Sequence, residues 1–362
     1  MKYVDEFRGT DLAQGLVDRI RRAATRPLTL MEVCGGQTHT ILKYGIQALL
    51  PETIELLHGP GCPVCVTPVA LIDHAVALAR EPGVCLTSFG DMLRVPGSAT
   101  DLLHVKARGG DVRMVYSPLD ALRLATEDPK RQVVFFAVGF ETTAPSIAAV
   151  IERAAALGLG NISFLTAHVL VPPALGAVLD AADNRVQAFL APGHVCTVMG
   201  YRQYEALASR YRVPIVVTGF EPVDLLQGIA NGVDLFNAGR GVVDNQYSRS
   251  VSRDGNVAAQ RAVDRVFEVC DREWRGIGMI PMSGLALRPA YHAFDAGRRF
   301  ALPPGVTETK NDCIAGEVLR GVRKPHDCAA FGARCTPERP QGAPMVSAEG
   351  VCAAYFQYRR TA

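Results

Sequence analysis

The chain is 362 residues long, with 48% hydrophobic residues, 20% charged residues and a formal net charge of +2 at pH 7. These values are typical of a globular protein with room for two or three domains. The balanced charge argues against a nucleic-acid partner, and the longest apolar run, 133–138, is too short to span a membrane.

The first residues contain acids at Asp5 and Glu6 and no apolar core, so we expect no secretory signal peptide and a cytoplasmic protein. Residues 1–25 are expected to form an amphipathic helix. The chain contains ten cysteines. In a reducing cytosol, cysteines serve as metal ligands or redox thiols more often than as structural disulfides.

Short β-rich runs alternate with helical segments from residue 27 to about residue 241, a pattern typical of parallel sheets covered on both faces. We therefore expect an α/β fold with two parallel-sheet units that share a central cleft. Residues 1–128 are predicted to hold the N-terminal helix and the first unit, and residues 129–245 the second. The predicted strands are Leu28–Val33, Ile54–Leu57, Val84–Ser88, Val112–Tyr116, Val133–Val138, Ile162–Thr166, Ala188–Leu190, Ile215–Val217 and Leu235–Phe236, and the helices between them include Ala99–Ala107, Ala144–Ala156, Ala174–Ala182 and Tyr201–Arg210.

The alternating pattern ends near residue 245. One further helix, Val257–Glu273, is predicted, and a tail rich in Gly, Pro and Cys follows it. Such a tail cannot bury enough apolar surface to order itself unaided. The sequence therefore predicts a metal-organised third domain over residues 246–362.

The first motif, MEVCGGQTH, delivers Cys34 from a predicted strand to a glycine pair, with a helix expected from about Thr38. Ligands bind at the carboxyl ends of parallel strands, and a helix N-terminus lowers the pKa of a nearby thiol. His39 offers a second metal-binding or proton-carrying group. The alternative is a buried structural cysteine with Thr38 as a helix cap.

The second motif, HGPGCPVC, also follows a predicted strand and places Cys62 and Cys65 at the start of a helix. Two cysteines at this spacing can form a reversible disulfide that contains an activated thiolate. Half of a zinc site is the alternative, but no second C-x-x-C is present to complete it. We interpret the two cysteines as a redox pair or as ligands.

Two more strand-end motifs are GFETT, with Glu141, and PGHVC, with His194. Taken singly, each is explained as well by helix capping or by a structural histidine. Four strand-end motifs that contain Cys, His and Glu nevertheless predict one shared functional site.

The tail contains four cysteines, Cys313, Cys328, Cys335 and Cys352. Four thiolates suit either a tetrahedral zinc ion or a cubane iron–sulfur cluster, and the spacing alone does not choose between them. Cys85 and Cys270 have no motif around them and are predicted to be core cysteines.

Together these motifs resemble the HypD family of [NiFe]-hydrogenase maturation factors. CGGQTH is similar to the family's CGGHTH box, with Gln37 in place of the first histidine. GPGCPVC, GFETT and the P-x-H-V-[SC] segment follow in family order, and the tail cysteines have the family's iron–sulfur spacing. Cys196 stands where many relatives have serine.

The resemblance implies a cytoplasmic scaffold for the Fe(CN)2(CO) unit of the hydrogenase active site, working with a HypC-type chaperone and a HypE-type cyanide donor. It implies that Cys34 holds the iron with a thiolate of the chaperone, and that Cys62 and Cys65 are redox-active. His39, Glu141 and His194 would tune protonation around the iron. The implied ligands of a [4Fe-4S] cluster are Cys313, Cys328, Cys335 and Cys352.

The residues alone leave two other functions open. One is an iron–sulfur-linked disulfide oxidoreductase that uses Cys62 and Cys65 on a small disulfide substrate. The other is a zinc-stabilised interaction protein with no catalytic role.

Overall fold

Two parallel sheets organise the chain in this computed structural model, which describes residues 5–304 and 312–358. Sheet A has the strand order β2-β1-β7-β8-β9 and sheet B the order β4-β3-β5-β6, and every pairing within them is parallel. The α/β fold class is thereby confirmed. The strands of sheet A are β1 (Leu28–Glu32), β2 (Ile54–His58), β7 (Ala188–Pro192), β8 (Ile215–Thr218) and β9 (Val243–Asn245), and those of sheet B are β3 (Val84–Ser88), β4 (Asp111–Met114), β5 (Gln132–Gly139) and β6 (Ile162–His168).

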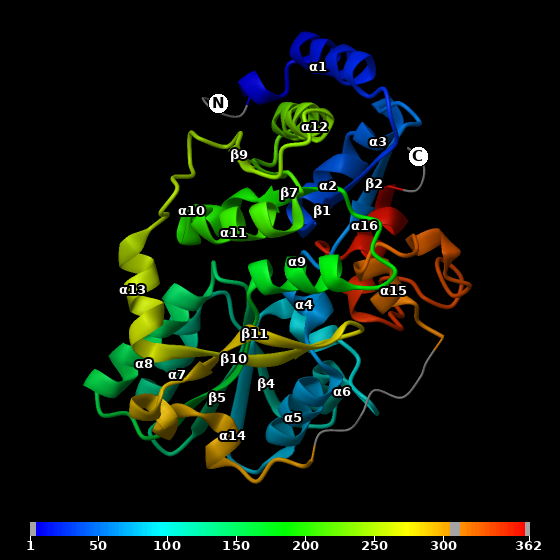
Figure 1. Cartoon of the computed structure of the whole chain (residues 1–362). Coiled ribbons are helices and arrows are strands. Elements are labelled where there is room, and N and C mark those ends of the chain that lie inside the picture. Colours follow the sequence, from blue (N-terminus) through cyan, green and yellow to red (C-terminus); the bar gives the residue numbers. More distant parts are fainter. Residues whose placement is uncertain (1–4, 305–311, 359–362) are drawn as a thin grey trace.

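The sheets do not divide the chain at residue 128, which corrects the predicted assignment of one sheet to each consecutive unit. Sheet A combines β1 and β2 with the later strands β7, β8 and β9, and sheet B takes the four strands between them. Hydrophobic runs identify strands but not their neighbours, so this interleaving was invisible in the sequence. Figure 1 shows the two sheets in opposite halves of the molecule.

Most helices cover the faces of the two sheets, and buried aliphatic side chains fill the space between the helices and the sheets. The amphipathic helix α1 packs on α12 through Val17 and Ile20, which confirms the N-terminal helix; residues 1–4 of that prediction lie outside the described residues. The α-helices are α1 (Thr10–Ala23), α2 (Gly35–Lys43), α3 (Ile46–Leu49), α4 (Pro63–Val66), α5 (Val69–Arg80), α6 (Leu102–Ala107), α7 (Pro118–Glu127), α8 (Ala144–Ala156), α9 (Val171–Asp180), α10 (Gly193–Met199), α11 (Arg202–Tyr211), α12 (Pro222–Asn237), α13 (Val257–Val266), α14 (Ala296–Arg299), α15 (Ala315–Leu319) and α16 (Val351–Tyr358). Short 3-10 turns are η1 (Asp5–Phe7), η2 (Gly90–Arg94), η3 (Pro289–Phe294), η4 (Pro325–Asp327) and η5 (Ala343–Met345).

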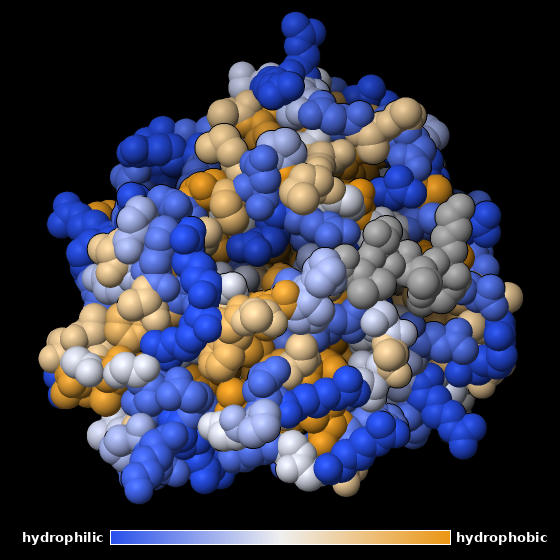
Figure 2. All heavy atoms as spheres, turned by 90° about the horizontal axis from the view of Figure 1, so that it is seen from below, coloured by the Kyte–Doolittle hydropathy of each residue, from blue (hydrophilic) through white to orange (hydrophobic). Residues whose placement is uncertain are grey.

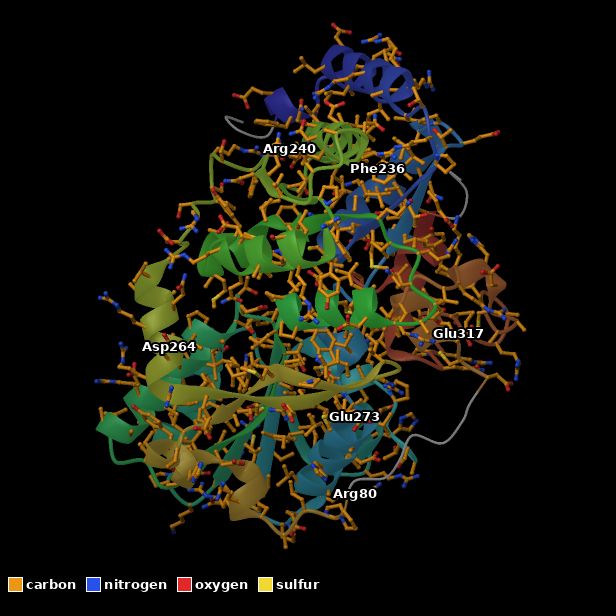
Figure 3. All side chains as sticks on the ribbon, viewed as in Figure 1. Arg80, Phe236, Arg240, Asp264, Glu273 and Glu317 are labelled. Atoms are coloured by element: carbon orange, nitrogen blue, oxygen red, sulfur yellow. A yellow bond between two sulfur atoms is a disulfide. The ribbon has the colours of Figure 1, made fainter. Side chains whose placement is uncertain are left out.

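Two predicted elements are wrong. The predicted strand Leu235–Phe236 is the last turn of α12, where Figure 3 labels Phe236. The guanidinium of Arg26 lies over the Phe236 ring, 4.0 Å from its centroid. The predicted helix Val257–Glu273 ends at Val266, and the chain continues as β10 (Phe267–Trp274), where Figure 3 shows Glu273.

β10 pairs antiparallel with β11 (Gly278–Leu287) in a hairpin that packs on β6 and α9. Only its ends, Phe267 and Trp274, are fully buried, so the middle of β10 lacks the apolar run that identifies the parallel strands. β10 is stabilised by its partner strand β11 and has no clear strand pattern of apolar residues in its sequence. The helix predicted from Val257 was therefore continued through β10 to Glu273.

Residues 312–358 form the segment drawn in orange and red in Figure 1, at the side of the molecule between the two sheets. Its helix α16 packs on α2, the helix that follows Cys34. Two small apolar clusters hold the segment together, and cysteines belong to both. Residues 305–311 and 359–362 of the predicted third domain lie outside the described residues.

The surface seen from below in Figure 2 is mainly hydrophilic, with apolar side chains gathered toward its centre. Within the described ranges, no helix combines the length and the apolar character that a membrane span requires.

The loops that follow β1 and β2 approach each other so closely that only glycine fits between them. A Cβ atom on Gly61 would lie 2.2 Å from the backbone nitrogen of Cys34 and 2.4 Å from the carbonyl carbon of Val33. The Gly35 amide donates to the Gly61 carbonyl at 2.9 Å, and the Gly59 amide donates to the Glu32 carbonyl at 2.7 Å. The two loops therefore form one rigid unit at the carboxyl edge of sheet A.

We expect Gly61→Ala to destabilise the protein by about 1–3 kcal/mol, because the added methyl group meets backbone atoms that cannot rotate away. Urea unfolding of the purified protein measures the change. Gly15→Ala is the matched control, since nothing lies within 4 Å of its added Cβ. In α1 that control is expected to raise stability by about 0.5–1 kcal/mol. Equal stability of Gly61→Ala and the wild type would contradict the packing argument.

Candidate functional site

Cys34 is the N-cap residue of α2, directly after β1. Its carbonyl accepts hydrogen bonds from the amides of Gln37, at 2.9 Å, and Thr38, at 3.0 Å. Its Sγ atom lies 3.6 Å from Nδ1 of His194. His194 is near the start of α10, the helix that directly follows β7, and β7 is a neighbour of β1 in sheet A. The structure thus brings together a thiol and an imidazole that are 160 residues apart in the sequence.

The Cys34 side chain is buried, with 3% of its surface exposed. Burial raises the pKa of the thiol strongly, and the nearby Glu32 carboxylate adds to the rise, whereas backbone hydrogen bonds from Gln37 and Gly36 lower it. The helix N-terminus therefore acts as predicted, but burial outweighs it. Cys34 is a neutral thiol at pH 7, and a metal ion is the partner that would favour its thiolate.

His194 is neutral under the same conditions, because burial lowers the pKa of its imidazole to about 4. Its ring packs against Phe220, with centroids 5.5 Å apart, and the same Phe220 ring lies against Gly36. A neutral imidazole next to a neutral thiol can accept the thiol proton at Nδ1 once the thiolate gains another stabilising partner.

Glu141 follows β5 of sheet B and is almost fully buried. Its Oε1 accepts the Val171 amide at 2.8 Å, while its Oε2 has no partner among the described residues. Burial raises the pKa of the carboxyl to about 7. Its charge in turn raises the pKa values of Cys196 and Tyr204, beyond the larger effect of their own burial, so these three groups form one buried polar cluster.

Two further residues of the first motif, Gln37 and His39, make their contacts elsewhere. The His39 ring lies edge-on to Tyr358 of α16, and its Nε2 is 3.1 Å from the Tyr358 hydroxyl. Gln37 is fully buried and donates to the Ala191 carbonyl at 3.1 Å and to the Thr218 hydroxyl at 2.7 Å. Gln37 therefore ties α2 to sheet A, a task that requires hydrogen bonding but no titratable ring.

Cys62 and Cys65 lie at the start of α4 as a close sulfur pair, with Cα atoms 5.2 Å apart, within the range that a disulfide requires. Both side chains are buried, with 3% and 1% exposed. Helix α4 packs against η5, whose residue Met345 lines the cavity of the tail cysteines. The redox-pair motif therefore lies between the Cys34 loop and the C-terminal segment.

All four tail cysteines line one small apolar cavity, together with Phe331 and Met345. Burial raises the pKa values of the Cys313 and Cys352 thiols, and the neighbouring cysteines raise them further. No set of three or more Cys, His, Asp or Glu side chains in the described ranges lies close enough to hold a single metal ion. The four thiols offer an all-sulfur donor set, which suits either a zinc ion or an iron–sulfur cluster.

The remaining two cysteines differ in burial. Cys85 is fully buried in β3, as expected for a core cysteine, whereas Cys270 is only half-buried on β10 beside Arg272.

Three residues near Cys34 were not singled out from the sequence. Glu32 and His58 form a buried pair below the Cys34 loop, and Glu349 covers Gly35 so closely that a Cβ there would lie 2.3 Å from the Glu349 carbonyl oxygen. A carboxylate at the end of the apolar strand LTLME was the available signal for Glu32. Glu349 gave no such signal, because only tertiary packing brings the tail to α2.

Glu141 predicts a specific pH dependence of stability. Its carboxyl has a pKa of about 7 when folded against 4.5 in the unfolded chain, so between these values the folded state binds the extra proton. Its contribution to the free energy of unfolding therefore falls by about 3 kcal/mol as pH rises from about 4.5 to 7. Above pH 7 the contribution stays at this lower value.

Glu141→Gln removes this contribution. The difference in urea midpoint between Glu141→Gln and the wild type should rise in favour of the variant from pH 5 to pH 7 and then level off. A difference that is independent of pH would show that the carboxyl does not titrate in this range.

Comparisons with known proteins give a consistent family. The family model described as "HypD: Hydrogenase formation hypA family" matches residues 11–359. The chain is 48% identical to hydrogenase maturation factor HypD2 of Bradyrhizobium diazoefficiens over 99% of this chain and 97% of that protein. It is 47% identical to HypD of Rhizobium leguminosarum bv. viciae (99% and 96%) and 48% identical to HypD of Escherichia coli K12 (99% of each). A match of this extent and identity shows that the chain belongs to the HypD family.

Proposed function

We propose that this protein is a hydrogenase maturation factor, the function that the names of its relatives carry. More specifically, it would be the scaffold on which the Fe(CN)2(CO) unit of a [NiFe]-hydrogenase is assembled, with a HypC-type chaperone and a HypE-type cyanide donor as partners. The observation that carries the proposal is the Cys34–His194 contact of 3.6 Å, next to the Cys62–Cys65 pair.

The iron would be held as substrate by the Cys34 thiolate and a thiolate from the chaperone. Soft thiolate ligands suit an iron that also carries cyanide and CO. As iron binds, the Cys34 thiol would give up its proton, and His194 would pass this proton on rather than keep it, because burial lowers the pKa of the imidazole to about 4. Glu141, protonated up to a pH of about 7, holds a further proton within the buried polar cluster that includes Cys196.

The Cys62 and Cys65 thiols would supply the electrons for cyanide release. The donor's thiocyanate accepts two electrons as its sulfur–carbon bond breaks, which gives a thiol and hydrogen cyanide. The two cysteines lose their protons to these products and form one S–S bond, so electrons and atoms balance. A disulfide then remains to be reduced before the next cycle.

The four tail cysteines would hold a [4Fe-4S] cluster, and the all-sulfur donor set around an apolar cavity fits that cofactor. When bound, such a cluster supplies electrons one at a time. The contact of α4 with η5 places the Cys62–Cys65 pair beside the segment that carries these ligands.

A disulfide oxidoreductase that acts on free substrates is the second candidate function. Cys62 and Cys65 expose 3% and 1% of their surfaces, so an external disulfide, like the donor's thiocyanate, must gain access to a sulfur before exchange. The family match favours the maturation function.

Cys34→Ala should leave the fold and the iron content of the tail intact, because neither depends on that thiol. It should abolish the cyanide and CO infrared bands of the complex with the chaperone, and hydrogenase activity with them. Cys270→Ala, which removes a half-buried thiol on β10, is the matched control and should retain the bands. Bands of wild-type intensity in Cys34→Ala would move the iron to another ligand and overturn the assignment.

Cys328→Ser should remove the brown absorbance of anaerobically purified protein and most of its iron. Because metal binding contributes folding free energy, residues 312–358 should then become sensitive to protease while both sheets stay resistant. Iron analysis, visible spectroscopy and limited proteolysis provide the measurements, with Cys270→Ser as control. Four irons per chain in Cys328→Ser would contradict its role as a ligand, and zinc in place of iron in the wild type would contradict the cluster.

A further inference from the structure

Below the Cys34 loop, a buried carboxylate receives hydrogen bonds from three different parts of the site. Glu32 is fully buried, and its Oε2 accepts the Cys34 amide at 2.8 Å. Its Oε1 accepts the hydroxyl of Thr38 in α2 and lies 2.6 Å from Nδ1 of His58. Both oxygens of the Glu32 carboxyl group therefore have hydrogen-bond partners within the site.

His58 connects this carboxylate to the other two functional segments. It is the last residue of β2, and the loop that begins after it carries Cys62. Its ring lies edge-on to Tyr355, with centroids 5.4 Å apart, and Tyr355 is on α16, one turn beyond Cys352. Only 5% of His58 is exposed, and its Nε2 has no hydrogen-bond partner among the described residues.

We propose that Glu32 and His58 are positioning residues of the Cys34 site, a role that rests on the proposed function. Glu32 fixes the Cys34 backbone through its amide, and His58 fixes Glu32. The pair thereby sets the direction in which Cys34 presents its sulfur beside His194, and it ties this direction to the Cys62 loop and to α16.

The packing explains why such a device is needed. Packing around the glycines confines the Cys34 backbone, but a thiolate must also hold the iron at a fixed place against a second protein's ligand. A buried carboxyl group with three hydrogen-bond partners is held in one geometry, because losing a partner leaves a buried polar oxygen unsatisfied. Partners that orient a metal ligand typically contribute 10- to 100-fold to metal affinity or activity, about the range expected here.

The test compares four variants in the full chain, copurified with its chaperone. Glu32→Gln keeps the shape of the side chain but replaces one acceptor oxygen by an NH2 group. This group cannot accept a hydrogen bond, so at least one of the three hydrogen bonds to Glu32 is lost. His58→Leu removes the donor to Glu32 at similar volume, whereas His58→Asn can still donate from the position of Nδ1. Asn161→Ala is the control: Asn161 is also buried and donates three hydrogen bonds, but it precedes β6 at the amino edge of sheet B.

We expect Glu32→Gln and His58→Leu to lower the cyanide and CO band intensity per chain about 10- to 100-fold. Any remaining bands should be shifted in frequency, which loss of stability alone would not cause. Thermal unfolding and iron content of the tail should stay within the range of Asn161→Ala, and His58→Asn should recover part of the intensity.

Two results would overturn the inference. One is wild-type band intensity and frequency in Glu32→Gln. The other is loss of cooperative unfolding or tail iron well beyond that of Asn161→Ala, which would make the pair a part of the fold. Absence of the bands from the wild-type complex would instead overturn the proposed function, and the inference with it.

Discussion

The close approach of the loops after β1 and β2 is the constraint on which the rest of the site depends. Gly61 lies against the Cys34 backbone with no room for a Cβ, so the two cysteine-bearing loops cannot move independently. Glu349 closes over Gly35 from the other side in the same way. Cys34, the Cys62–Cys65 pair and the C-terminal segment are therefore held as one body, although they lie far apart in the sequence.

Burial then determines the protonation of the site. The Cys34 pKa is raised and the His194 pKa is lowered, so each group stays neutral without a ligand. A free thiolate would be reactive toward oxidants, whereas a buried thiol is inert until a metal replaces its proton. The same burial keeps Glu141 protonated to a pH of about 7. Without a ligand, the Cys34 thiol is therefore a weak nucleophile.

The motifs of this chain could be found from the sequence, but their spatial partners could not. Continuous Val, Ile and Leu runs identified eight of the nine strands of the two sheets, including Val84–Ser88 with its observed bounds. β9 was missed, because its three residues, Val243–Asn245, carry one apolar side chain. Cys34 and His194 were selected from their strand-end positions, yet the interleaved order of sheet A, which makes them neighbours, has no local signal. His39 was selected by the same rule but lies against Tyr358 instead. It belongs to the face of α2 on which α16 packs, and nothing in the sequence indicates this packing.

The docking of α16 also couples the tail to the Cys34 loop in thermodynamic terms. Helix α16 carries Cys352, and it contacts α2 through Tyr358 and His58 through Tyr355. If a cluster orders the segment that contains these residues, part of its binding free energy stabilises the contacts that cover Gly35 and confine His58. Linkage is reciprocal, so whatever orders the Cys34 loop must also favour the ordered tail. If the proposed cluster is present, a chain that lacked it would lose part of the packing of Glu349 on Gly35, and the Cys34 loop would be less well ordered.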